Sequence, residues 1–352
     1  MSRDRKLYVF PGNIENEILN KGCEQVPYMR TNEFSLVYMN CSNIITELMG
    51  CKNGKTIIHT MSGTAALESV VLTYCKNISS LAINAGGFGA RWKEIGDYHS
   101  LNMSELVIGK DNDNYYSELE KAINEKNVKV VMMQHHETST GELLNIRKVG
   151  RICKKYNIIF VVDAISSFLA DEMSMEDMNI DVVIVSTQKA LNIPPGLALV
   201  TLSQRAITSI EHSTYYYDFE NNLNNLSRGQ TPFSPATQLF LQLELRLKQI
   251  VADTPKVYMD KISSRAMYFR SLCAVNGWDI NTVKKSNAIS AVNVPIPAKY
   301  ICDELVKENI YVMPSGDPYL LRVAHTGVQT NIDLEELVER IVTIIGDYSE
   351  KK

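Results

Sequence analysis

A series of short, continuous apolar runs between about residues 55 and 205 limits the fold of this chain more than any other feature. Segments of helical pattern, such as 64–74 and 146–156, separate these runs. Continuous apolar runs, unlike alternating ones, are typical of strands that are covered on both faces. We therefore predict an α/β fold with a mostly parallel, mixed sheet, whose strands are 56–60, 81–84, 128–133, 158–163, 181–186 and 197–202.

Beyond about residue 233 the pattern changes and indicates a smaller α+β unit. A closing helix is predicted over 333–348, with Asn331 or Asp333 near its N-cap. The other elements predicted there are helices over 237–251 and from Thr254-Pro255 onward, and strands over 290–294, 311–313 and 320–324.

The length of the chain, 352 residues, exceeds what a single hydrophobic core usually organises. We therefore predict two domains, a large one over 20–254 and a small one formed by 1–19 together with 255–352.

Composition excludes several classes of protein. The chain has 36 basic and 40 acidic residues, so it lacks the basic excess of a nucleic-acid binder. Its seven cysteines include no C-x-x-C pair, which argues against a disulfide framework and a cysteine-rich zinc site. No apolar run reaches membrane-spanning length, and 7–10 is too short for a signal peptide core. We expect a cytoplasmic protein with no nucleic-acid or membrane partner.

Polar residues follow the first two predicted strands, where an open α/β sheet presents its functional groups. Ser62-Gly63-Thr64 precedes a helix, so its backbone N–H groups either hold a phosphate or form an ordinary helix cap. Gly86-Gly87-Phe88-Gly89 follows the second strand. Its glycines permit close approach to a ligand, on whose ring Phe88 would stack; the alternative is a tight turn with Phe88 in the core.

The third strand ends in a polar cluster, 134–141, that packing alone does not explain. Its adjacent histidines, His135 and His136, raise the hypothesis of a metal site. Adjacent side chains of a strand point to opposite faces, however, and would not chelate one ion. We predict no metal.

Asp163 ends the fourth strand and Lys189 follows the fifth. Burial of a carboxylate such as Asp163 costs free energy unless a cation or hydrogen-bond donors pair with it. Lys189 in isolation would be interpreted as a surface lysine. Together they suit pyridoxal phosphate, which needs an amine for its Schiff base, an acid for its ring nitrogen, phosphate donors and a flat group over its ring. A Schiff-base aldolase would explain Lys189 but neither Asp163 nor the phosphate donors.

The sequence also resembles the class V aminotransferase family over roughly residues 8 to 330. Two segments depart from the common family pattern, Pro-Gly-Asn at 11–13 and Arg-Val-Ala-His-Thr-Gly at 322–327. The matching segments are Phe10-Pro-Gly, Ser62-Gly-Thr-Ala-Ala, Glu137-Thr-Ser-Thr-Gly, Val162-Asp-Ala, Ser186-Thr-Gln-Lys, Gly229-Gln-Thr-Pro and Leu321-Arg-Val-Ala-His.

The resemblance implies the fold type I architecture of pyridoxal phosphate enzymes and a role for each matching residue. Lys189 and Asp163 would be catalytic, as the Schiff-base residue and the partner of the pyridinium. Thr138 would reach the ring hydroxyl and Phe88 would stack on the ring. The phosphate would be held by Ser62, Gly63, Thr64 and Gln188.

Three further residues carry implied roles at the substrate and at a subunit interface. Arg322 would bind the carboxylate or phosphonate of the substrate, because a guanidinium suits such groups. Thr231 would reach the cofactor phosphate of a second subunit, which implies a homodimer. Arg30 is a candidate second substrate contact, or else an ordinary surface arginine.

Within the family the runs Asp163-Ala-Ile-Ser-Ser-Phe and Phe88-Gly-Ala-Arg-Trp favour a 2-aminoethylphosphonate–pyruvate transaminase. An amino donor and a keto acid would then be its small-molecule partners. The alternatives are an alanine–glyoxylate or serine–pyruvate transaminase, a class V desulfurase or lyase, and a non-catalytic scaffold of the same fold.

Overall fold

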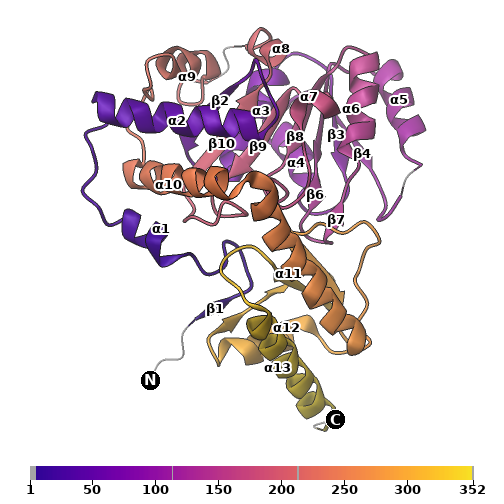
Figure 1. Ribbon diagram of the computed structural model, residues 1–352. Helices are drawn as coiled ribbons and strands as arrows, with labels where there is room; N and C mark the ends of the chain where they lie inside the picture. The colour runs from indigo at the N-terminus through magenta and orange to yellow at the C-terminus, as the bar shows by residue number, and fades with distance from the viewer. Residues whose placement is uncertain (1–4, 113, 212–213, 351–352) are drawn as a thin grey trace.

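The computed structural model describes residues 5–112, 114–211 and 214–350, which form a larger unit and a smaller unit joined by a long helix (Figure 1). A seven-stranded sheet forms the centre of the larger unit. Its order is β2 (Lys55–Thr60), β10 (Leu197–Leu202), β9 (Val182–Ser186), β8 (Ile159–Asp163), β5 (Val130–Gln134), β3 (Ser80–Asn84) and β4 (Met103–Val107).

Strand direction in this sheet is mixed. β10 pairs antiparallel with both of its neighbours, β2 and β9, whereas the other neighbouring pairs are parallel. The predicted mostly parallel, mixed sheet is therefore confirmed. Of its strands only β4 was not predicted. It lies at the edge of the sheet, where its residues alternate between buried and more exposed positions and so lack a continuous apolar run.

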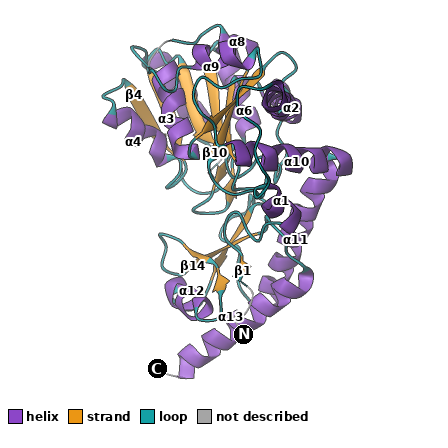
Figure 2. Cartoon of the chain, turned by 90° about the vertical axis from the view of Figure 1, so that its left-hand side faces the viewer, coloured by secondary structure: helices purple, strands orange, loops and turns teal. Residues whose placement is uncertain are grey.

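Helices cover both faces of the sheet (Figure 2). One apolar cluster joins α2, α5, α6 and α10 to one face, and another joins α3 and α4 to the other. Along β5, Val131 and Met133 belong to the first cluster, whereas Val130 and Met132 belong to the second. This two-sided burial explains why the strands are continuous apolar runs. The helices are α2 (Asn32–Leu48), α3 (Gly63–Tyr74), α4 (Ala90–Tyr98), α5 (Tyr116–Glu125), α6 (Ile146–Lys155) and α10 (Thr237–Asp253).

The smaller unit has its own core. A third apolar cluster contains Tyr8 from the start of the chain and otherwise residues 269–344. We propose that the predicted boundary at Thr254 separates two domains, because α11 begins at Pro255 and carries the chain into this cluster. Its elements are β1 (Lys6–Leu7), α11 (Pro255–Val275), β11 (Ile289–Asn293), α12 (Ala298–Val306), β12 (Ile310–Tyr311), β13 (Met313–Pro314), β14 (Leu320–Ala324) and α13 (Asn331–Glu350).

The start of α13 differs from the prediction. Thr330 is the capping residue, since its hydroxyl oxygen accepts a hydrogen bond from the Asp333 N–H at 3.2 Å. The Asp333 carboxylate accepts one in return from the Thr330 N–H at 2.9 Å. A reciprocal pair of this kind satisfies two backbone groups at a helix start. Asn331 and Asp333 lie near this N-cap as predicted, although the helix begins at Asn331 and not at residue 333.

Short elements complete the description: α1 (Asn16–Lys21), β6 (His136–Glu137), β7 (Glu142–Leu143), α7 (Met175–Met178), α8 (Gln204–Ile207) and α9 (Phe219–Leu226). Across the three described ranges, no helix combines the length and the apolar character that crossing a bilayer requires.

Buried histidines give the fold a predicted sensitivity to acid. Burial lowers the pKa of His59, in β2, to about 4. In the unfolded chain that pKa returns to about 6.5, so below this pH the unfolded state takes up the proton first. The stability that the neutral ring provides is complete above pH 6.5 and is lost as the pH falls towards 4, by up to about 3 kcal/mol.

Urea denaturation between about pH 7.5 and 4.5 measures this loss. We expect the free energy of unfolding to fall less steeply with pH in His59→Gln than in the unchanged protein. Equal slopes for the two proteins would show that His59 does not contribute to the acid sensitivity.

Candidate active site

A cavity opens at the carboxyl ends of β8 and β9, beside the start of α3. It brings together most of the residues that the sequence singled out, although these come from five separate stretches of the chain. The predicted residues among its lining are Ser62, Gly63, Thr64, Phe88, Thr138, Asp163, Gln188 and Lys189. Five more lining residues had no predicted role there: Arg91, His136, Ile165, Ser166 and Ser186.

Asp163 ends β8 and Lys189 follows the end of β9, and these neighbouring parallel strands bring both residues to the cavity. Burial lowers the pKa of the Lys189 ammonium to about 8, although the negative charge of Asp163 opposes that shift. Burial raises the pKa of Asp163 to about 6, opposed by the Ile165 N–H, which donates to it at 2.8 Å, and by the charge of Lys189. Perturbed groups that meet in a cavity are typical of active sites.

Phe10 is an aromatic neighbour of Lys189 that the sequence did not assign to the site. The Lys189 Nζ atom lies 3.9 Å from the centroid of the Phe10 ring. A ring face attracts an ammonium ion, and it also keeps water from that side of the amine. Phe10 comes from the loop between β1 and α1, so the start of the chain closes the site from one side.

The start of α3 forms the phosphate-binding end of the cavity. The Ser62 hydroxyl oxygen accepts a hydrogen bond from the Ala65 N–H at 3.2 Å and so caps the helix. At Gly63 an added Cβ would lie 2.6 Å from Cδ1 of Ile165, so a larger residue would require the Ile165 side chain to shift. Arg91 donates to Thr64 Oγ1 at 3.3 Å and adds a positive charge at this end. A helix N-terminus with hydroxyls and a guanidinium is suited to a phosphate.

The glycine-rich turn is held by Glu137, another residue without a predicted role. Its buried carboxylate accepts hydrogen bonds from the Phe88 N–H at 3.2 Å and from the Gly89 N–H at 3.1 Å. It also accepts from the Gln134 side chain at 2.8 Å and from the Ser139 N–H at 3.0 Å. A carboxylate with this many donors fixes the turn, and with it the Phe88 ring that lines the cavity.

Thr138 belongs to a chain of polar groups along one wall. Its Oγ1 atom lies 2.8 Å from Ser166 Oγ, which lies 2.9 Å from His136 Nδ1. Burial holds the pKa of His136 well below its usual value, so the ring is neutral. His136 Nε2 and Ser186 Oγ are buried without a hydrogen-bond partner. These unsatisfied atoms line the cavity and are suited to a polar ligand rather than to packing.

Arg322 does not line the cavity but lies next to it. Its guanidinium donates to the Thr138 carbonyl at 3.0 Å and to the Pro314 carbonyl at 2.7 Å. Its positive charge is also one of the causes that lower the pKa of Lys189. The residue therefore joins β14 of the smaller unit to the cavity wall.

Arg30 and Thr231 lie elsewhere and contact each other. Arg30 donates to the Thr231 carbonyl at 2.6 Å and to the Gln230 side chain at 3.1 Å. Thr231 lines a different, smaller cavity, together with His59 and Phe233. Within this chain neither residue belongs to the Lys189 cavity.

The residues of this cavity fit pyridoxal phosphate. A lysine of lowered pKa is available for the aldehyde, a buried carboxylate for the ring nitrogen, and a helix start with Arg91 for the phosphate. The unsatisfied Ser186 and His136 atoms supply further polar contacts. Among the residues that the structure describes, no group of three or more histidine, cysteine or acidic side chains is placed to hold a metal ion.

Comparison with known proteins gives a consistent family. A family model described as Aminotransferase class-V matches residues 23–221. An uncharacterized aminotransferase of Helicobacter pylori is 26% identical over 330 residues, which cover 90% of this chain and 87% of that protein.

Two further matches are informative. The bifunctional phosphonoacetaldehyde hydrolase/aminoethylphosphonate transaminase of Clostridioides difficile is 28% identical over 305 residues, covering 81% of this chain and 47% of that protein. The solved structure of an alanine–glyoxylate aminotransferase from Nostoc sp. matches the fold with a TM-score of 0.91 at 18% sequence identity. The match covers 98% of this chain and 96% of the Nostoc chain.

Proposed function

The chain belongs to the class V aminotransferase family and is a pyridoxal phosphate-dependent transaminase, and from this premise we propose which residues act and on which donor. The donor we propose is 2-aminoethylphosphonate, with pyruvate as the acceptor. The observation that carries the assignment of the site is the meeting of Lys189 and Asp163 in one cavity, on neighbouring strands.

Bound pyridoxal phosphate supplies an aldehyde that condenses with amines and a ring that accepts an electron pair. Lys189 is the amine that holds this aldehyde. Because its pKa is about 8, part of the lysine is neutral near neutral pH, as a nucleophile and a base must be. With the cofactor bound, the free Nζ atom of Lys189 would be the group that takes a proton from the carbon of the amino donor and gives it back during the transfer.

Asp163 would keep a proton on the ring nitrogen, because a buried carboxylate is stabilised by a positive charge beside it. Thr138, which contacts Ser166, would bind the ring hydroxyl. Phe88, in the turn that Glu137 holds, would contact the ring. The phosphate is bound at the start of α3 by Ser62, Gly63 and Thr64, together with Gln188.

The choice of donor rests on two observations. The relative from Clostridioides difficile carries aminoethylphosphonate transaminase in its name, and the match covers 81% of this chain. Arg322 also supplies a guanidinium group beside the cavity, and guanidinium groups bind phosphonates in a bidentate manner.

The donor is tested with purified, cofactor-loaded protein and a panel of 2-aminoethylphosphonate, alanine and serine, each with pyruvate or glyoxylate. The visible absorbance of the cofactor should decrease on addition of the correct donor alone and return with the acceptor. We expect the highest kcat/KM for 2-aminoethylphosphonate with pyruvate. A higher value for alanine or serine with glyoxylate would replace the proposed donor and leave the reaction class unchanged.

The cysteines argue against desulfurase activity. None of the seven lines the Lys189 cavity, and only Cys23 is exposed. Burial raises the pKa of Cys153, among others, so these thiols remain protonated and unreactive. Sulfide release from cysteine would contradict this assignment.

A homodimer is the second part of the proposal. Arg30 holds the loop that carries Thr231 by donating to its carbonyl, which leaves the loop ordered but outside the chain's own cavity. We propose that Thr231 contacts the cofactor phosphate of a second copy. Sedimentation should give a dimer, and Thr231→Ala should weaken cofactor binding. A monomer with full activity would exclude this arrangement.

Removal of the Arg322 charge should weaken substrate binding. The loss of one charge-assisted contact costs roughly 1.5–3 kcal/mol, so Arg322→Gln is expected to raise KM about 10- to 100-fold. Because Arg322 does not line the cavity, the visible spectrum of the cofactor should change little. Steady-state kinetics measures the effect, with Arg151→Gln, an exposed residue of α6, as the matched control. An unchanged KM in Arg322→Gln would remove this residue from the substrate site.

A further inference from the structure

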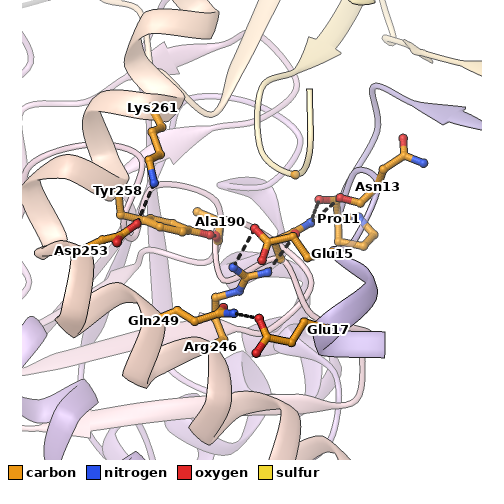
Figure 3. A network of polar contacts seen from close by, with 12 residues as sticks. Pro11, Asn13, Glu15, Glu17, Ala190, Arg246, Gln249, Asp253, Tyr258 and Lys261 are labelled. Carbon is orange, nitrogen blue, oxygen red and sulfur yellow. Dashed lines mark hydrogen bonds and ion pairs between the residues drawn. The ribbon is translucent and has the colours of Figure 1, made fainter. Parts of the chain in front are cut away.

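A second polar cavity is lined by residues of α10 and α11 and by Asn192. Figure 3 shows the polar contacts around Arg246, Tyr258 and Lys261 in its wall. Its volume is about 360 Å³, whereas a single water needs roughly 15 Å³ on the same scale, so it has room for a polyatomic ion with waters. The residues that matter for the argument are Glu15, Asn192, Arg246, Tyr258, Lys261 and Arg265, which all line it.

The charged residues that line this cavity do not cancel, although Glu17 lies just outside the lining and accepts a hydrogen bond from Gln249 at 2.7 Å. Lys261 pairs with Asp253 at 2.7 Å, and Arg246 pairs with Glu15 at 3.2 Å. Arg265 has no carboxylate of its own among the described residues. It donates instead to two backbone carbonyls, from Nε to Lys261 at 2.9 Å and from Nη1 to Gly327. The lining thus carries one more cation than anions.

Arg246 adds unsatisfied hydrogen-bonding capacity. Its side chain is 2% exposed, and its two terminal nitrogens make long contacts, 3.2 Å to Glu15 and 3.3 Å to Asn192. The Nε atom of Arg246 is buried with no partner. Arg246 is buried and Arg265 is partly buried, and an anion beside such guanidinium groups stabilises them because they have lost part of their hydration.

The same cavity is connected to the active-site lysine. The Tyr258 hydroxyl donates to the Ala190 carbonyl at 2.6 Å, and the Asn192 N–H donates to the Lys189 carbonyl at 2.9 Å. The Asn192 side chain donates in turn to the Pro11 carbonyl, next to Phe10, at 2.8 Å. Tyr258 and Asn192 in the cavity wall therefore form hydrogen bonds with the backbone at Lys189 and Ala190.

We propose that this cavity binds a small oxyanion, a phosphate or a compact carboxylate, between Arg246 and Arg265. The bound anion joins α10 to α11 and stabilises the backbone that carries Lys189. The site is separate from the substrate site, and the proposal does not depend on which donor the enzyme uses.

Titration calorimetry of the cofactor-loaded protein tests the proposal, with inorganic phosphate and malonate as probes at constant ionic strength. Loading fills the phosphate end of the Lys189 cavity, so that phosphate does not bind there. We expect saturable binding of at least one probe and a rise in the unfolding temperature as it binds. The probe that binds more tightly identifies the chemistry as tetrahedral oxyanion or carboxylate.

Two variants separate this cavity from the substrate site. Arg265→Gln removes the unpaired cation and should weaken probe binding about tenfold or more, as expected when a charge-assisted contact is lost. Arg322→Gln should leave the affinity for the probe unchanged. Absence of saturable binding, or loss of binding in Arg322→Gln but not in Arg265→Gln, would overturn the proposal.

Lys261→Gln provides an independent test if Arg265→Gln does not fold. Lys261 is exposed and its ammonium contacts only Asp253, so the fold does not depend on it. Its removal should weaken probe binding about two- to fivefold, which is the size of an exposed charge contact. An unchanged affinity in this variant would also contradict the site.

Discussion

Lys189→Ala is expected to abolish transamination, with a loss in kcat of at least about 10³-fold. Two functions disappear with the amine, the covalent attachment of the cofactor and the proton transfer at the donor carbon. The protein should still bind some pyridoxal phosphate, because the phosphate-binding end at α3 is untouched. Its visible spectrum should therefore become that of a non-covalently bound cofactor. Absorbance before and after gel filtration measures the bound cofactor, and a coupled assay of the same sample measures the rate of transamination.

Lys154→Ala is the matched control for this substitution. Lys154 lies exposed on α6, and its removal should change neither the spectrum nor the rate. Circular dichroism of both variants excludes loss of fold as the cause. If Lys189→Ala transaminates at the rate of the unchanged protein, the active site lies elsewhere.

Asp163→Asn is expected to retain cofactor and lose most activity. Removal of one partner from a buried charge pair costs about 3–5 kcal/mol, which is roughly 10²- to 10⁴-fold in kcat when the pair acts in the rate-limiting step. The amide keeps the size of the side chain and its contact with the Ile165 N–H, but it does not hold a proton on the ring nitrogen. Steady-state rates and bound cofactor per chain measure the two effects separately.

Asp171→Asn is a demanding control because it also neutralises a buried carboxylate. Burial raises the pKa of Asp171 to about 6, as it does for Asp163, but Asp171 is bound by Ser286 and Asn287 outside the Lys189 cavity. Its variant should lose stability and keep its turnover per folded chain. Equal losses of turnover in both variants would mean that Asp163 acts only on the fold.

Much of the large sheet was predictable because its physical cause is visible in the sequence. Residues on both faces of a strand such as β5 are buried, so every position must be apolar and the run is unbroken. β4 has no such requirement, since an edge strand contacts solvent and accepts Ser104 and Glu105 among its apolar residues.

The lysine and the carboxylate of the candidate site were predictable for a related reason. Asp163 and Lys189 stand at or just beyond the ends of buried strands, where a charged group is conspicuous. The parallel pairing of β8 and β9 then brings them to the same edge of the sheet.

Residues that reach the cavity by tertiary contact were not predictable in this way. Phe10 lies near the start of the chain, and only folding places it 3.9 Å from the Lys189 amine. Glu137 lies within a predicted polar cluster, but its role depends on donors from a turn about fifty residues earlier in the chain. Because Glu137 and the glycine-rich turn are far apart in the sequence, no local sequence pattern reveals that they are in contact.

The position of Arg322 has a consequence for the molecules that this enzyme admits. In the resting protein its guanidinium already has two acceptors, the carbonyls of Thr138 and Pro314. An incoming anion must displace neutral oxygens that are already in place, so a ligand of single, diffuse charge gains little from the exchange. A doubly charged headgroup gains much more. The existing hydrogen bonds of Arg322 would therefore favour the binding of dianions over monoanions. Arg322 would give up its hydrogen bond to the Thr138 carbonyl only when a dianion binds.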